Sequence, residues 1–167
     1  YNVQAMIFAA LALEVTLVAG GLPCAAGLAV DPQGTPFLST GTQVVRVVAR
    51  NVVKPFVETG GRPVGLAFDA AGNLWVGTDG GGLNRLDRRT GRFTYYDAAF
   101  LGAAAVQALY QDSAGFVWIG TWAGGLVRLD PRTGQTRRYL HDPRDPTTIG
   151  MESIWDIVEN REGELIL

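Results

Sequence analysis

Two tryptophans and an aspartate are the first candidates for ligand contact in this sequence. Trp122 and Asp79 stand beside glycines at corresponding places of two repeated segments, and both are expected in the loop after a second strand. An exposed indole in such a loop can stack on a saccharide or contact a protein, because loops on a rigid scaffold carry many binding residues. Trp155 lies in the run 153–159, which is expected to form the first strand of the next blade. Burial in the core is its expected role, and a ligand contact is the alternative.

Two arginines could bind an anion. Arg85 and Arg128 stand two residues before Asp87 and Asp130, in equal places of the repeat. A guanidinium at this place could clamp a carboxylate or phosphate group. A cross-strand salt bridge or a solvated strand face is the favoured interpretation of both arginines.

The sequence predicts no catalytic residue, no metal site and no cofactor. His141 is the only histidine and Cys24 the only cysteine, so neither a His-rich zinc site nor a Ser-His-Asp triad is expected. His141 lies in a long polar loop, residues 140–151, and is expected to be exposed. Four polar residues recur three positions before a glycine and predict hairpin turns, with a Ca²⁺ loop as the alternative: Asp31, Asp69, Asp112 and Asn160.

Composition narrows the class of protein. The chain of 167 residues has 14 Lys and Arg against 16 Asp and Glu, a net charge of -2 and no basic stripe, which argues against nucleic acid as a partner. Hydrophobic residues make up 47% of the chain, which favours a globular domain. The 22 glycines suit an all-β fold with many tight turns.

A sequence repeat gives the organisation of the chain. The segment 69–78 recurs as 112–121 without a gap, 43 positions later, and the match continues through 130 and 133–134. Weaker copies lie 38 positions upstream of the first segment and 48 positions downstream of the second. Periods of this length are typical of a four-stranded propeller blade.

Each repeat contains four short runs that predict strands. In the copy that starts at residue 64 they lie at 64–69, 74–78, 83–87 and 93–97. Hairpin-length loops join them, which predicts an antiparallel meander. Both faces of these strands are apolar, so each sheet needs a neighbour on each side. The sequence therefore predicts a β-propeller of four-stranded antiparallel blades that forms an incomplete ring.

The expected boundaries follow the repeat. Blades are predicted at 27–63, 64–105 and 106–152, and the start of a further blade at 153–167. Residues 1–26 are interpreted as a degenerate strand of a preceding blade, with the remnant of an apolar membrane segment as the alternative. An array that ends inside a blade leaves strand edges exposed, so self-association of the isolated chain is also expected.

The motif from Asp112 through Gly115 and Trp118 to Thr121, followed by the residues 125–130 and 133–134, resembles the two-component regulator propeller repeat. The copy near Asp31 departs from it, with Phe37 at the tryptophan position and Ser39 at the glycine position. The resemblance implies the extracytoplasmic (periplasmic) sensor region of a membrane-bound hybrid histidine kinase or a related bacterial regulator. Such a region would bind a small molecule or a protein, and the rest of the parent chain would complete the propeller.

Two alternatives stay open. Residues 20–76 also resemble the repeats of lactonase-like propellers, which implies a metal-dependent hydrolase. The expected inner strand starts are apolar or small and disfavour a metal site in the channel: Ala25, Val64, Val106 and Ile154. A scaffold propeller that binds only protein is the third interpretation.

Overall fold

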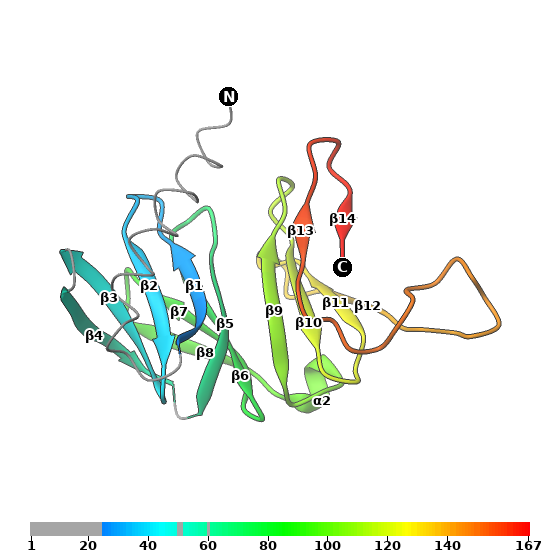
Figure 1. The fold of residues 1–167 in the computed structure, drawn as a ribbon, viewed down its shortest axis with the longest axis horizontal. Coiled ribbons are helices and arrows are strands. Elements are labelled where there is room, and N and C mark those ends of the chain that lie inside the picture. The colour runs from blue at the N-terminus through cyan, green and yellow to red at the C-terminus, as the bar shows by residue number, and fades with distance from the viewer. Residues whose placement is uncertain (1–24, 50–51, 60) are drawn as a thin grey trace.

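A computed structural model describes residues 25–49, 52–59 and 61–167. These residues form three four-stranded antiparallel sheets and one two-stranded hairpin (Figure 1). The predicted all-β fold with propeller-like blades is confirmed. The interpretations placed on residues 1–24, including Cys24, fall outside the described residues.

The sheets follow one another along the chain. The first contains β1 (Ala25–Val30), β2 (Pro36–Thr40), β3 (Gln43–Ala49) and β4 (Val52–Glu58). The second contains β5 (Arg62–Phe68), β6 (Leu74–Asp79), β7 (Gly82–Asp87) and β8 (Arg92–Tyr96). The third contains β9 (Val106–Gln111), β10 (Val117–Thr121), β11 (Leu126–Leu129) and β12 (Thr136–Tyr139).

Three shorter elements complete the described chain. The helix α2 (Ala98–Leu101) links the second and third sheets, and the hairpin of β13 (Val158–Glu159) and β14 (Leu165–Ile166) follows the third. The connection from β12 to β13 projects away from the sheets (Figure 1). Within each four-stranded sheet the strands neighbour one another in chain order, as the four runs of the repeat predicted. No helix among the described residues is long and apolar enough to cross a membrane.

The repeated aspartate builds the turn between the first and second strands. Asp69 Oδ1 accepts from the backbone N–H of Asn73 at 2.8 Å, and Oδ2 accepts from the Trp75 indole N–H at 3.1 Å. Gly72 completes the turn with a φ of +80°, a conformation that glycine adopts without steric cost. Asp112 repeats this arrangement with Phe116 at 2.9 Å and the Trp118 indole at 2.7 Å. The predicted hairpin turns are confirmed.

The copy that lacks the tryptophan replaces the indole donor. The Phe37 side chain has no N–H group, and Asp31 Oδ2 accepts instead from Arg88 Nη1 of the neighbouring sheet at 3.0 Å. The Arg88 guanidinium also lies 5.5 Å from the centre of the Phe37 ring. This buried carboxylate therefore keeps a donor although the sequence motif has changed.

Glycines set the distance between neighbouring sheets. A Cβ on Gly77 of β6 would overlap the side chain of Val106, the first residue of β9. A Cβ on Gly120 of β10 would lie 2.9 Å from Ile154 Cγ2. The segment that begins the next part of the repeat, at Val106 or Ile154, thus packs directly on the backbone of the second strand of the preceding sheet. Apolar clusters fill the space around this contact.

The two repeated tryptophans have the same register but different burial. Trp75 pairs with Ala67 and Arg85, and Trp118 pairs with Tyr110 and Arg128. Trp75 is completely buried, whereas Trp118 is only partly buried. The two tryptophans are therefore equal in register and unequal in burial. Within the described residues, the face that carries Trp118 is covered by the short β13–β14 hairpin and the segment before it, instead of a four-stranded sheet.

Candidate functional site

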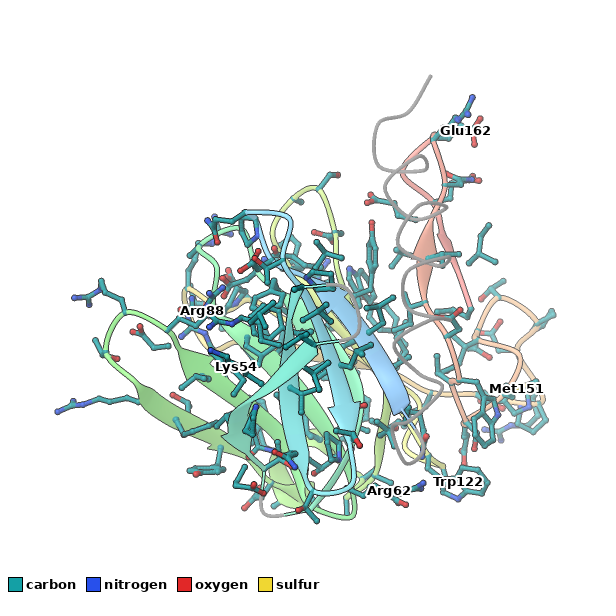
Figure 2. The ribbon with its side chains drawn as sticks, turned by 60° about the vertical axis from the view of Figure 1, so that its left-hand side comes forward. Lys54, Arg62, Arg88, Trp122, Met151 and Glu162 are labelled. Atoms are coloured by element: carbon teal, nitrogen blue, oxygen red, sulfur yellow. The ribbon has the colours of Figure 1, made fainter. Side chains whose placement is uncertain are left out.

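Trp122 and Trp155 meet at one end of the third sheet. Their ring centres are 5.0 Å apart and the ring planes are nearly perpendicular, at 88°. Trp122 is 51% exposed and Trp155 is 61% exposed. We call this pair the indole corner. Figure 2 shows Trp122 at the opposite end of the molecule from Glu162, which lies in the turn between β13 and β14.

Backbone hydrogen bonds hold the loop of Trp122 in place. The Trp122 N–H donates to Ala105 O at 3.0 Å, which ties the loop to the segment before β9. On the other side, the Ala123 N–H donates to Ser153 Oγ at 3.1 Å. The Ile154 N–H donates to Thr121 O at 3.0 Å. The segment that carries Trp155 is thereby fixed against the end of β10.

Ala123 has a strained backbone. Its φ of +59° makes it the only non-glycine residue with positive φ in the described part of the chain. The corresponding residue of the second sheet is Gly80, with a φ of +91°. An alanine in this conformation costs about 1–2 kcal/mol relative to its usual backbone. Strain of this kind is concentrated at functional sites, where the surrounding contacts maintain it.

The structure corrects the expected burial of Trp155. The residues 153–157 are not a strand, because β13 comprises only Val158 and Glu159. Ile154 and Ile157 are buried in the cluster beside the third sheet, and Trp155 between them points to solvent. The side chains of Ile154 and Ile157 face the core, and the Trp155 indole therefore lies outside it. Trp122 is exposed, which fits its place in a loop that the repeat does not require to hold an aromatic residue.

Asp79 does not join the indole corner. It is the last residue of β6 instead of a loop residue. Its Oδ2 forms an ion pair with Nη2 of Arg62, at the start of β5, at 2.6 Å. Both side chains are largely exposed, so this pair contributes at most about 1 kcal/mol to stability. The second sheet thus carries an ion pair at the place where the third sheet carries Trp122.

Arg85 and Arg128 lie elsewhere and differ from each other. Arg85 is 3.7 Å from Asp69 and lies over the Trp75 ring, so the expected salt bridge is present. Arg128 has no carboxylate partner among the described residues and stacks on Phe116, 4.4 Å from the ring centre. Each arginine borders a surface hollow, of about 280 Å³ at Arg85 and about 490 Å³ at Arg128. Neither is brought next to the indole corner.

A polar contact that the sequence did not predict joins the third sheet to the β13–β14 hairpin. The Tyr110 hydroxyl donates to Glu159 Oε2 at 2.9 Å, and Ser113 Oγ donates to Glu159 Oε1 at 3.2 Å. Burial and the hydrogen bond to Glu159 raise the pKa of Tyr110 to about 12. This contact ties β9 and its turn to β13.

The only histidine is not freely exposed as expected. His141 Nδ1 is 2.8 Å from Ile149 O, and the side chain is partly buried. The ring therefore braces the connection from β12 to β13. Among the described residues, no group of three or more His, Cys, Asp or Glu side chains gathers as a metal site would require.

The pairing of Trp122 with Trp155 was not predicted, since the two residues are 33 positions apart. A signal existed in the sequence. Trp122 corresponds to Asp79 and Trp155 corresponds to Gln107, so both tryptophans depart from the repeat. The loop after the second strand of one sheet lies beside the start of the next segment along the chain. Two residues that differ from the repeat at these two places therefore come into contact.

Comparison with known proteins identifies the repeat. Residues 101–123 match the family model described as a two-component regulator propeller, which confirms the resemblance seen in the sequence. No curated protein matches the chain.

Solved structures share the fold. Extracellular domains of two candidate hybrid two-component systems from B. thetaiotaomicron match 87% of this chain at 19% and 17% identity, with TM-scores of 0.67 and 0.69. The chain spans 20% and 22% of the length of those domains. Virginiamycin B lyase from Staphylococcus aureus matches 83% of this chain at 15% identity, with a TM-score of 0.62, and the match covers 46% of that protein. At these identities the likeness concerns the fold alone.

Proposed function

We propose that this chain is part of an extracytoplasmic, periplasmic sensory propeller that binds its ligand at the indole corner and signals to a linked two-component regulator. In this proposal the three sheets are blades of a larger ring, which other parts of a parent chain complete. The parent would be a membrane-bound hybrid sensor histidine kinase. The match of residues 101–123 to the regulator propeller family supports the class of protein.

The observation that carries the proposal is the exposure of two large aromatic side chains in contact with each other. An indole normally contributes its area to a core or an interface, so two that are more than half exposed indicate a binding surface. Both stand on connections at one end of a rigid sheet, where binding residues of repeat proteins are carried. The strained Ala123 next to Trp122 supports the same assignment.

The ligand in this proposal is a small molecule, a saccharide included, or a protein, and the chain itself performs no catalysis. A lactonase-like hydrolase would need carboxylate or amide side chains converging on the channel. Although β5 itself begins at Arg62, the residues at matching places near the starts of the inner segments are apolar: Val64, Val106 and Ile154. A protein-binding scaffold would use the same indole corner, and it differs from a sensor only in lacking an output.

The test uses the longer protein that contains this chain, in its own bacterium. Trp122→Ala combined with Trp155→Ala should abolish the transcript response to the inducing compound, with unchanged protein in the membrane. Tyr95→Ala is the matched control, since Tyr95 on β8 is an aromatic residue that is 71% exposed and lies outside the corner. An undiminished response in the double variant would refute the proposed site. The same gene should also encode a membrane-spanning helix and a histidine kinase core.

A further inference from the structure

We propose that the indole corner binds an organic cation, namely the alkylated ammonium group of a small molecule. The inference rests on the proposed function, because it names the ligand class of the same site. The two rings meet edge to face with centres 5.0 Å apart, and each side chain is more than half exposed, so indole surface remains open to a ligand. A cation is attracted to the face of an indole more strongly than to any other aromatic side chain.

The charges around the corner favour a cation. Glu152 and Asp156 flank Trp155 in the sequence, and both are exposed. Asp156 Oδ1 accepts only from the adjacent Ile157 N–H, and Glu152 makes no side-chain hydrogen bond or ion pair with any described residue. No lysine or arginine occurs in residues 93–127 or 145–160, the two segments that carry the tryptophans. Exposed carboxylates raise the local concentration of cations.

Two arginines lie on neighbouring segments. Arg62 is neutralised by Asp79 at 2.6 Å. Arg138 packs its guanidinium on Gly102, a residue whose carbonyl is near Gly124 in the loop of Trp122. If the site took an anion, Arg138 would be its cationic partner. A cation site predicts that removal of this charge leaves the affinity unchanged or raises it.

The two indole rings favour an alkylated cation over a primary ammonium ion. A primary ammonium ion is strongly hydrated and binds best where acceptors replace its water. An alkylated ammonium group donates no hydrogen bond, and aromatic faces are its usual recognition surface in proteins. The hydrogen bonds of Trp122, Ala123 and Ile154 hold the corner before a ligand arrives, which lowers the entropic cost of binding.

The experiment is a titration of the whole chain with choline, followed by the four indole N–H signals in NMR spectra. Choline should shift the signals of Trp122 and Trp155 and leave those of Trp75 and Trp118, whose indole N–H groups are bonded to Asp69 and Asp112. Trp122→Ala and Trp155→Ala should each weaken binding about two- to fivefold, the effect of one exposed cation–π contact. The neutral isostere 3,3-dimethylbutan-1-ol should bind more weakly than choline by at least this factor.

Charge variants give the second readout. Glu152→Gln should weaken choline binding, whereas Glu162→Gln should not, because Glu162 is an exposed glutamate at the opposite end of the molecule (Figure 2). Arg138→Gln should not weaken it. Each variant must retain the far-ultraviolet circular dichroism of the wild type.

Several results would overturn the inference. Equal affinity for choline and its neutral isostere would show that charge does not contribute, and weaker binding in Arg138→Gln would indicate an anion site. No shift at Trp122 or Trp155 with choline would also refute it. If a saccharide then shifted these two signals, the cation would be wrong while the ligand-binding function of the corner would stand.

Discussion

Replacing Gly77 with alanine tests the packing between the second and third sheets. The new Cβ would overlap Val106 Cγ1 and lie 3.0 Å from Val106 Cβ and 3.3 Å from Val106 O. Neither partner can retreat, because Val106 is completely buried and its carbonyl belongs to the backbone of β9. We expect a loss of about 1–3 kcal/mol in the free energy of unfolding, the usual cost of overpacking a core.

Urea unfolding followed by circular dichroism measures this loss, and a double-mutant cycle assigns it to one contact. Val106→Ala alone should cost about 1.5–3 kcal/mol through the lost methyl groups and the cavity. The double variant should be more stable than the two separate losses predict, by about 1 kcal/mol or more, because the overlapping Cγ1 is gone. Gly150→Ala is the control, since its Cβ would meet nothing within 4 Å. Additive losses in the cycle would show that β6 and β9 do not pack as described.

Three further outcomes are expected. Trp75→Ala should cost about 3–5 kcal/mol in urea unfolding and Trp118→Ala about 2–3 kcal/mol, because only Trp75 is completely buried; equal losses would contradict this difference. The pKa of Tyr110 is about 12 in the folded chain against an ordinary 10, so its contribution to stability is complete below pH 10 and is lost as the pH rises toward 12. Tyr110→Phe should flatten this alkaline loss, and an unchanged pH profile of the unfolding midpoint would contradict the contact with Glu159. Finally, lactone and ester hydrolysis should stay at background, and turnover that a chelator removes would contradict a non-catalytic role.

The fold could be predicted because the repeated turn residues mark where the strands of each sheet begin and end. Asp69 with Gly72, and Asp112 with Gly115, mark the same turn in two segments, and the turn fixes the strands on either side of it. The indole N–H that completes the turn is also encoded, since the tryptophan follows the aspartate by six residues. Local hydrogen bonding of this kind needs no knowledge of the neighbouring sheet.

The site could not be predicted to the same extent, because it depends on contacts between separate copies. The run 153–159 is predicted as a strand, but Ile154 and Ile157 are buried and Trp155 is exposed. The composition of the run gives no sign of which apolar residues face inward when the strand does not form. Arg128 shows the same limit, since its place in the repeat suggested a carboxylate partner and the nearby Phe116 provides an aromatic one.

Sheet-to-sheet contact through glycine has a consequence for how such chains diversify after duplication. Gly77 is matched to Val106, and Gly120 to Ile154, so each half of the fit is encoded in a different copy. At the first boundary Ser39 replaces the glycine, and the close approach moves to Gly27, whose N–H donates to Ser39 Oγ at 2.6 Å. A copy inserted or exchanged at a sheet boundary would separate these matched halves. An exchange that keeps each glycine with its partner would therefore have to include the second strand of one sheet and the first strand of the next.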